Sequence, residues 1–376
     1  MKLTALHWLP YRIPFREAFI TAHGALTHRS GALVRVSTST GRTGYGEIAP
    51  LPTHSGSGLN EALTALARLA PAIRGQDIGD VLRFLEMGEQ EAQLPAALRC
   101  GLEMALLDAW GQDRQASIAA LLTGAYAAEQ VQEPLTTLLR VPVNAVMSGT
   151  PGEATLAKVR AAIAAGFTCL KMKVIEASQA TVEWVAALRA ALGPLPRLRL
   201  DANEGWTLEQ ARWMLEQCVP YDIQYVEQPL HACDLEGMAR LRRNSPIALA
   251  ADEAISGLDS ARRVLEADAA DVLILKPQLA GGLRTCRQII REAHRRGVAC
   301  VITSTLETGV GIAAALQLAA ASPEVTMACG LATSDLLEDD LLRESLMINN
   351  GHMSVPAGSG LGVQLRLKEA SMAWVE

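Results

Sequence analysis

Residues 169–174 read CLKMKV, a short apolar run that contains two lysines. If this run is a strand, alternation places Lys171 and Lys173 on one face and the apolar side chains on the other. Seven more runs of strand length recur between residues 141 and 330: VPVNAV at 141, LRLDAN at 198, YVEQPL at 225, ALAADE at 248, VLILKP at 272, CVITST at 300 and VTMACG at 325. Stretches of helical length lie between them. Eight near-equal units of this kind favour a closed barrel of alternating strands and helices over a doubly wound open sheet.

The two ends of the chain have a different sequence pattern. Residues 29–50 contain two β-rich runs around a turn, and residues 58–75 and 94–112 have helical periodicity, which together predict an α+β module. Near the C-terminus, INNGHMSV predicts a tight hairpin at Asn350-Gly351. We expect this tail to return to the N-terminal module. The expected division is therefore an α+β module over 1–125, a barrel over 126–330 and a returning segment over 331–376.

Composition narrows the class of function. The chain has 376 residues, 49% of them hydrophobic, and a net charge of −6 without a basic run, which disfavours a nucleic-acid or membrane partner and favours a small-molecule substrate. Seven cysteines without CxxC spacing predict buried thiols, a reducing cytoplasm and no zinc site. The N-terminal segment is broken by His7, Pro10 and Arg12, so we expect no signal peptide. The apolar run 309–321 is too short to span a membrane and predicts a buried helix. Whether the chain forms a homo-oligomer is left open.

Charged residues stand at the ends of five successive predicted strands: Lys173, Asp201, Glu227, Asp252 and Lys276. In a barrel of this type the active site lies at the carboxyl ends of the strands. Three carboxylates that converge there repel one another unless a cation lies among them, and their hard oxygen ligands suit Mg²⁺. The alternative is three unrelated structural carboxylates. No Cys or His occupies these strand ends, which disfavours a softer metal.

The lysines fit the same site. A cation close to another cation and to a divalent metal has a lowered pKa, so Lys173 is the candidate general base and Lys171 the neighbour that lowers its pKa. Lys171 could instead pair with a nearby carboxylate. Lys276, four strands later, would face Lys173 across the pocket. This arrangement predicts removal of a proton next to a substrate carboxylate, with the enediolate stabilised by the metal and the facing lysine.

These motifs together resemble the enolase superfamily, in its muconate-lactonizing subgroup. The residues that carry the resemblance are LKMKV, LDANEGW, YVEQPL, ADE and LKP, with GYGEIAPLP near residue 44. The resemblance implies an α/β fold, with an α+β capping domain formed by both chain ends over a modified TIM-type (β/α)7β barrel. It also implies that Asp201, Glu227 and Asp252 bind Mg²⁺, with Mn²⁺ as a substitute.

Within the subgroup, the chain is most similar to the o-succinylbenzoate synthase family. The stretches that point there are TSTLETGVGIAAALQLAA at 303–320, GLATSDLLEDDL at 330–341 and PAGSGLGV at 356–363. This resemblance implies a syn-dehydration of 2-succinyl-6-hydroxy-2,4-cyclohexadiene-1-carboxylate to 2-succinylbenzoate, in menaquinone or phylloquinone biosynthesis. Lys173 would take the α-proton and then help the hydroxyl leave as water. Lys276 would remain an ammonium against the enediolate.

Four further residues are candidates for substrate binding. Alternation turns Arg199 into the barrel interior, where it could pair with Asp252 or reach a substrate carboxylate. Asn203 follows the Asp201 strand end. Ser304 and Thr305 could hydrogen-bond the succinyl arm or act as helix caps. The stretches at 21–30 and 50–58 are expected to be loops over the pocket, on which His23 and His54 are surface residues.

Two other readings compete with a lyase. One is an isomerase, either an N-acylamino acid racemase or a dipeptide epimerase, in which Lys173 and Lys276 work from opposite faces. Dipeptide epimerases carry Asp-x-Asp after the eighth strand, where this chain has only Asp335 early in the stretch ATSDLLEDD. The other reading is a non-catalytic protein that kept the fold, which predicts a broken set of motifs; here every motif is intact.

Overall fold

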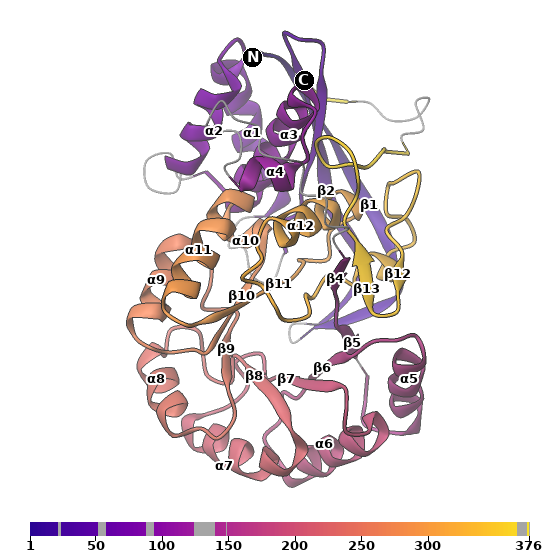
Figure 1. Ribbon diagram of the computed structural model, residues 1–376, viewed down its shortest axis with the longest axis vertical. Helices are drawn as coiled ribbons and strands as arrows, with labels where there is room; N and C mark the ends of the chain where they lie inside the picture. The colour runs from indigo at the N-terminus through magenta and orange to yellow at the C-terminus, as the bar shows by residue number, and fades with distance from the viewer. Residues whose placement is uncertain are drawn as a thin grey trace.

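The computed structural model describes residues 1–21, 24–51, 58–87, 94–123, 140–147, 149–366 and 374–375. It consists of an antiparallel sheet with helices at one end and a curled parallel sheet ringed by helices at the other (Figure 1). The expected boundary at 125–126, and His23 and His54 of the expected loops, lie outside the described residues.

The N-terminal third of the chain forms the cap. Its sheet has the order β1-β2-β3 and consists of β1 (Leu3–Thr21), β2 (Gly24–Thr38) and β3 (Thr43–Ile48). Four helices follow: α1 (Leu59–Ile73), α2 (Ile78–Met87), α3 (Ala96–Arg114) and α4 (Ile118–Leu122). The predicted hairpin over 29–50 is confirmed. The expected loop at 21–30 is wrong, because Gly24–Ser30 continue strand β2 against β1.

Helix α3 lies directly on strand β3, and two glycines explain the close approach. A Cβ on Gly44 would lie 2.1 Å from the carbonyl oxygen of Ala105, and one on Gly46 would lie 2.0 Å from that of Gly101. A larger residue at either position would therefore push the helix off the sheet. This packing is the physical reason for the glycines in the stretch GYGE.

The barrel consists of seven parallel strands in the order β11-β10-β9-β8-β7-β6-β5. Its strands are β5 (Ala145–Met147), β6 (Cys169–Lys173), β7 (Arg197–Asp201), β8 (Ile223–Glu227), β9 (Leu249–Ala251), β10 (Val272–Leu275) and β11 (Ala299–Ile302). Its helices are α5 (Glu153–Ala164), α6 (Gln179–Leu192), α7 (Leu208–Cys218), η1 (Val219–Tyr221), α8 (Leu235–Asn244), α9 (Leu258–Glu266), α10 (Pro277–Ala280), α11 (Leu283–Arg295) and α12 (Gly309–Ala320).

The eighth predicted strand closes the ring with two residues. Cys329 bridges Val143, and Gly330 bridges Thr303 beyond the end of β11. The backbone N–H of Cys329 donates to Pro142 O at 2.7 Å, and that of Gly330 donates to Ile302 O at 2.8 Å. The predicted alternation of eight strands and helices is thus confirmed, with the last strand reduced to this short link.

Two apolar clusters hold the fold together. A small one fills the barrel interior: Tyr225, Ala250, Val272, Ile274 and Val301. A large one joins the outer faces of the strands to the helices and continues into the cap. Helix α12 belongs to it, which confirms the prediction that the apolar run at 309–321 is a buried helix.

The C-terminal segment contains the predicted hairpin, formed by β12 (Ile348–Asn349) and β13 (His352–Ser354) and preceded by η2 (Ser334–Leu336). Asn350 and Gly351 have φ values of 50° and 68°, as the tight turn requires. The hairpin pairs with β4 (Arg140–Pro142) beside the barrel. Farther along, Trp8 and Val375 exchange backbone hydrogen bonds of 3.0 and 2.9 Å, so the tail also reaches the cap.

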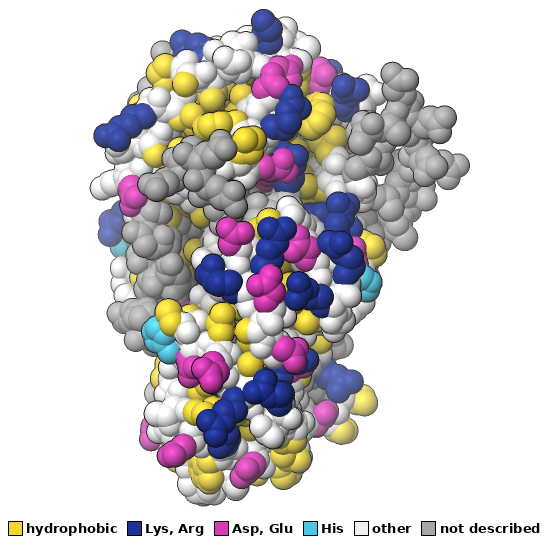
Figure 2. Space-filling model, turned by 90° about the vertical axis from the view of Figure 1, so that its left-hand side faces the viewer, with side chains coloured by type: hydrophobic (Ala, Val, Ile, Leu, Met, Phe, Trp, Pro, Cys, Tyr) yellow, Lys and Arg dark blue, Asp and Glu magenta, His cyan; other side chains and the backbone are white. Residues whose placement is uncertain are grey.

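Acidic and basic side chains are interspersed over the helical face in Figure 2. Ion pairs join neighbouring helices, such as Arg262 with Glu292 and Arg284 with Glu86, each at 2.7 Å. No helix in the described part of the chain is long and apolar enough to cross a membrane. All seven cysteines are free thiols, and all but Cys233 are buried, as predicted.

Candidate active site

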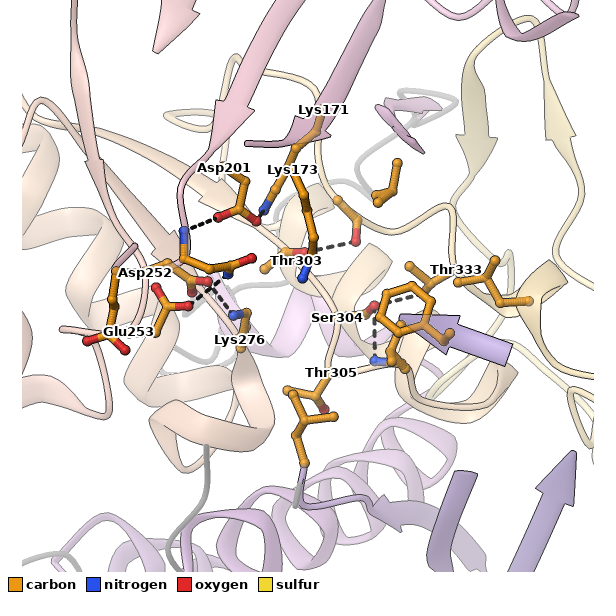
Figure 3. Close-up of a pocket in the computed structure, with 18 residues that line it drawn as sticks. Lys171, Lys173, Asp201, Asp252, Glu253, Lys276, Thr303, Ser304, Thr305 and Thr333 are labelled. Carbon is orange, nitrogen blue, oxygen red and sulfur yellow. Dashed lines mark hydrogen bonds and ion pairs between the residues drawn. The ribbon is translucent and has the colours of Figure 1, made fainter. Parts of the chain in front are cut away.

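The five charged strand-end residues meet at one end of the barrel. In the strand register, Lys173 of β6 lies opposite Asp201 of β7, and Asp201 lies opposite Glu227 of β8. Asp252 and Lys276 directly follow β9 and β10. All of them except Glu227, which lies buried beneath, line a cavity of about 140 Å³. Figure 3 shows the four that line it, Lys173, Asp201, Asp252 and Lys276, toward one end of that cavity.

Two of the three lysines are paired with the carboxylates. Lys171 Nζ lies 2.9 Å from Asp201 Oδ2 and also donates a short hydrogen bond to Glu227 Oε1. Lys276 Nζ donates to Asp252 Oδ2 at 2.6 Å. Lys173 makes no hydrogen bond or ion pair within the described part of the chain, although its side chain lines the cavity. Its amino group is therefore the one placed to meet a substrate.

The carboxylate partners of Lys171 set the direction of its pKa shift. Burial lowers the pKa of Lys171, but attraction to Asp201 and Glu227 outweighs this effect and raises the pKa well above its ordinary value. The pKa of Lys276 is also raised, because Asp252 outweighs the effect of burial. Without a divalent cation among them, the carboxylates therefore raise the pKa of both lysines. The alternative that Lys171 pairs with carboxylates describes this conformation.

The carboxylate oxygens are ligands that suit a hard divalent cation. Within the described residues, no three His, Cys, Asp or Glu side chains lie close enough together to hold a metal ion, and the ammonium groups of Lys171 and Lys276 contact the carboxylates instead. Asp201, Glu227 and Asp252 supply oxygen ligands that are at most 3% exposed. Glu227 Oε2 has no hydrogen-bond partner among the described residues, so one buried carboxylate oxygen remains available to a cation.

Polar residues around the carboxylates fix the strand ends. Asn203 donates from Nδ2 to Glu253 Oε1 at 3.0 Å and from its backbone N–H to Asp201 Oδ1 at 3.1 Å. The Gln228 side chain, which is fully buried, accepts from the backbone N–H of Asp252 at 3.0 Å. Burial, followed by repulsion from Asp252, raises the pKa of Glu253 to about 7. Asn203 lines the cavity, and its substrate contact stays a prediction, while Gln228 was not singled out from the sequence.

The other end of the cavity is lined by hydroxyl groups and apolar side chains (Figure 3). Ser304 Oγ and Thr333 Oγ1 share a hydrogen bond of 2.7 Å, and Thr305 Oγ1 donates to Ala49 O at 3.3 Å. Neither Ser304 nor Thr305 caps α12, since Thr308 is the N-cap residue. Asp335 is exposed and is not among the residues that line the cavity, so this end carries no acid in the described part of the chain.

Arg199 does not lie where a substrate contact was expected. It is fully buried in the barrel interior, with its guanidinium 4.8 Å from the centre of the Tyr225 ring. Its hydrogen bonds go to Gln224 Oε1 at 2.7 Å, Asn144 Oδ1 at 3.1 Å and Ala328 O at 2.8 Å. The alternative that Arg199 pairs with Asp252 is therefore wrong, and Arg199 is not among the residues that line the cavity. Alternation placed it correctly in the interior but not at the correct depth.

The cap is tied to the barrel by residues that the sequence did not reveal. Glu47, which is fully buried, accepts from the Thr308 hydroxyl at 2.7 Å and from the backbone N–H groups of Thr308 and Gly311, each at 2.9 Å. Its carboxylate thus caps helix α12 across the interface. Gln278 donates to Glu47 O at 2.8 Å and accepts from the Ala49 N–H at 3.0 Å. The acid in GYGE was the available signal for this link.

Comparison with known proteins agrees with this geometry. The family model described as "Enolase C-terminal domain-like" matches residues 154–370, and "MenC, N-terminal domain" matches residues 3–107. An o-succinylbenzoate synthase of Thermobifida fusca (strain YX) is 38% identical over 234 residues, 61% of this chain and 71% of that protein. A hydrophobic dipeptide epimerase of Enterococcus faecalis (strain V583) is 30% identical over 329 residues, 87% of this chain and 90% of that protein.

Solved structures agree as well. The dipeptide epimerase of Enterococcus faecalis V583, complexed with Mg and the dipeptide L-Leu-L-Tyr, matches with a TM-score of 0.88 at 26% identity. The match covers 97% of this chain and 100% of that one. The chain therefore belongs to the enolase superfamily, among the enzymes of its muconate-lactonizing and o-succinylbenzoate synthase subgroup.

Proposed function

We propose that this enzyme is an o-succinylbenzoate synthase, which dehydrates 2-succinyl-6-hydroxy-2,4-cyclohexadiene-1-carboxylate to 2-succinylbenzoate. One observation carries the choice among the reactions of the subgroup. The cavity end opposite the charged residues offers the hydroxyls of Ser304 and Thr333 beside apolar side chains, with no acid among its described residues. A substrate ammonium would lack a counter-charge there, whereas a succinyl arm would find hydrogen-bond donors and an apolar wall.

The chemistry assigned to the residues follows from their surroundings. Lys173, which has no other partner among the described residues, removes the α-proton of the substrate. Lys276 acts as an ammonium group that stabilises the negative charge that develops on the substrate. Asp201, Glu227 and Asp252 would hold Mg²⁺, which when bound neutralises the charge on the substrate carboxylate.

The second half of the reaction returns the proton. After the α-proton has moved to Lys173, the resulting ammonium donates it to the departing hydroxyl, and water leaves. The C–H bond breaks and its electron pair becomes the new π bond of the aromatic ring, while the electron pair of the C–O bond leaves with the oxygen as water, so no oxidant is required. The product would enter menaquinone or phylloquinone biosynthesis in the cytoplasm.

An isomerase is the second candidate. The dipeptide epimerase with 30% identity covers more of the chain than the synthase does, 87% against 61%. Lys173 from β6 and Lys276 after β10 line the same cavity, so one could remove a proton and the other return it. An N-acylamino acid racemase or dipeptide epimerase would use the two lysines in that manner.

The test mixes purified protein, Mg²⁺ and the cyclohexadiene and follows aromatisation by ultraviolet absorbance. The synthase requires rapid, metal-dependent loss of the diene signal, abolished in Lys173→Ala. Absence of turnover, with α-proton exchange from deuterated solvent into N-acylamino acids or dipeptides, would replace the synthase with the isomerase.

A further inference from the structure

Leu306 has an unusual backbone conformation at the wall of the cavity. It lies between β11 and α12 with φ of +67°, in the left-handed region that favours glycine and asparagine. Its side chain is only 7% exposed and lines the cavity. A strained residue that keeps a large apolar side chain at a binding site suggests that the side chain itself is needed there.

Arg29 of strand β2 holds this strained segment from the cap. It is 2% exposed and donates from Nε to Leu306 O at 3.1 Å. The same guanidinium donates to Pro50 O at 3.0 Å and forms a short hydrogen bond with Ala49 O. One rigid fork therefore fixes the Leu306 backbone relative to residues 49–50 of the cap.

The residues joined by Arg29 form one wall. Leu51, directly after the Arg29-bound carbonyls, lines the cavity together with Leu306. Ser304 connects this wall to the hydroxyl groups, because its Oγ accepts from the Leu306 N–H at 3.3 Å and also bonds to Thr333. The far end of the cavity therefore combines polar groups with a wall of fixed position, which suits an acyl arm with methylene groups and a polar tip.

We propose that Leu306 is a specificity-determining residue whose side chain packs against the methylene groups of the substrate's acyl arm, and that Arg29 is the positioning residue that holds it there. The inference rests on the proposed function in so far as it assumes an acyl arm at this end. It does not depend on whether the reaction is dehydration or isomerisation, since both begin with removal of the α-proton.

The experiment compares α-proton exchange into N-succinyl and N-acetyl derivatives of one amino acid, using the Mg²⁺-loaded enzyme. In Leu306→Ala and Leu306→Gly, kcat/KM for the succinyl compound falls about tenfold or more relative to the acetyl compound, mainly through KM. Leu306→Gly also unfolds at a higher temperature than Leu306→Ala, because glycine relieves the backbone strain. Leu318→Ala, a buried substitution in α12 away from the cavity, lowers the unfolding temperature but keeps the ratio.

Arg29→Lys retains the charge but not the fork, and we expect it to lower the same ratio while exchange of the acetyl compound persists. A loss of unfolding temperature with an unchanged ratio would reduce Arg29 to a structural role and overturn its assignment. An unchanged ratio in both Leu306 variants, or a wild-type enzyme indifferent to the two arms, overturns the whole inference. Failure of the cyclohexadiene dehydration with the ratio preserved would remove only the proposed synthase.

Discussion

Lys276 Nζ lies 2.6 Å from Asp252 Oδ2, and the two residues follow adjacent barrel strands. Both side chains are nearly buried, with 11% and 4% of their surface exposed. Lys171 has the same relationship to Asp201 and Glu227. In this conformation two ammonium groups pair with the three carboxylates, and the amino group of Lys173 faces the cavity.

This division of roles predicts opposite effects for two neighbouring lysines. Lys173→Ala should lower kcat by about 10²–10⁴-fold while leaving the free energy of unfolding nearly unchanged, because Lys173 has no partner among the described residues. Lys171→Ala should lower the free energy of unfolding by about 3–5 kcal/mol in the absence of metal, because it leaves two buried carboxylates without their counter-charge. Urea unfolding measures the free energy of unfolding of the two variants, and the absorbance assay measures their kcat. Equal destabilisation by both variants would contradict the assignment.

Metal binding should be visible in stability. If Asp201, Glu227 and Asp252 bind Mg²⁺, saturating Mg²⁺ stabilises the folded protein by about 2.7 kcal/mol at 100 times the dissociation constant. Thermal unfolding with and without Mg²⁺ measures this shift, and chelation should abolish turnover. Asp252→Asn should lose most of the shift, whereas Asp335→Asn, at an exposed position, should keep it. A shift of equal size in Asp252→Asn would exclude that carboxylate from the ligand set.

Local periodicity explains which features could be predicted from the sequence. Alternation within CLKMKV and LRLDAN fixes which side chains face the barrel interior, and equal spacing places the strand ends on one rim. Lys173 and Asp201 indeed lie opposite each other in the register of β6 and β7. The same rule does not give depth along the barrel. Arg199 was predicted to pair with Asp252 or to reach a substrate carboxylate, and it instead bonds Asn144 and Gln224.

Contacts between distant segments were beyond such rules. Glu47 accepts from Thr308, 261 residues later in the chain, and Gln278 bonds to the backbone of the same strand. These partners depend on how the cap is seated on the barrel, which hydrophobic periodicity does not encode. The closing strand is a further example, because its apolar run at 325–330 pairs through only Cys329 and Gly330.

Glu307 predicts a pH dependence of stability. Burial, followed by repulsion from Glu47, raises the pKa of Glu307 to about 7 from the ordinary value of 4.5. Between these two pH values the folded protein retains a proton that the unfolded chain has released, so this contribution to stability decreases as pH rises through the window. The loss should approach roughly 3 kcal/mol. Urea unfolding of Glu307→Gln from pH 4.5 to 7.5 should show a shallower decline than wild type, and parallel curves would contradict the raised pKa.

Gln278 should couple the cap to the catalytic lysine. Gln278 lies two residues after Lys276. Its fully buried amide donates to Glu47 O and accepts from the Ala49 N–H. Gln278→Met keeps the length and apolar packing but leaves both backbone groups without their partner, at a cost of about 1–3 kcal/mol for each buried group. We expect kcat to fall with little change in KM, because the Lys276 ammonium loses its position while the hydroxyl end of the cavity is retained.

Gln278→Glu, which retains the acceptor for Ala49 N–H, should be less impaired in kcat at pH 5 than at pH 8, since a protonated carboxyl can also donate to Glu47 O. A pH-independent defect in Gln278→Glu, or a rise in KM alone, would show that the hydrogen bonds of Gln278 do not position Lys276.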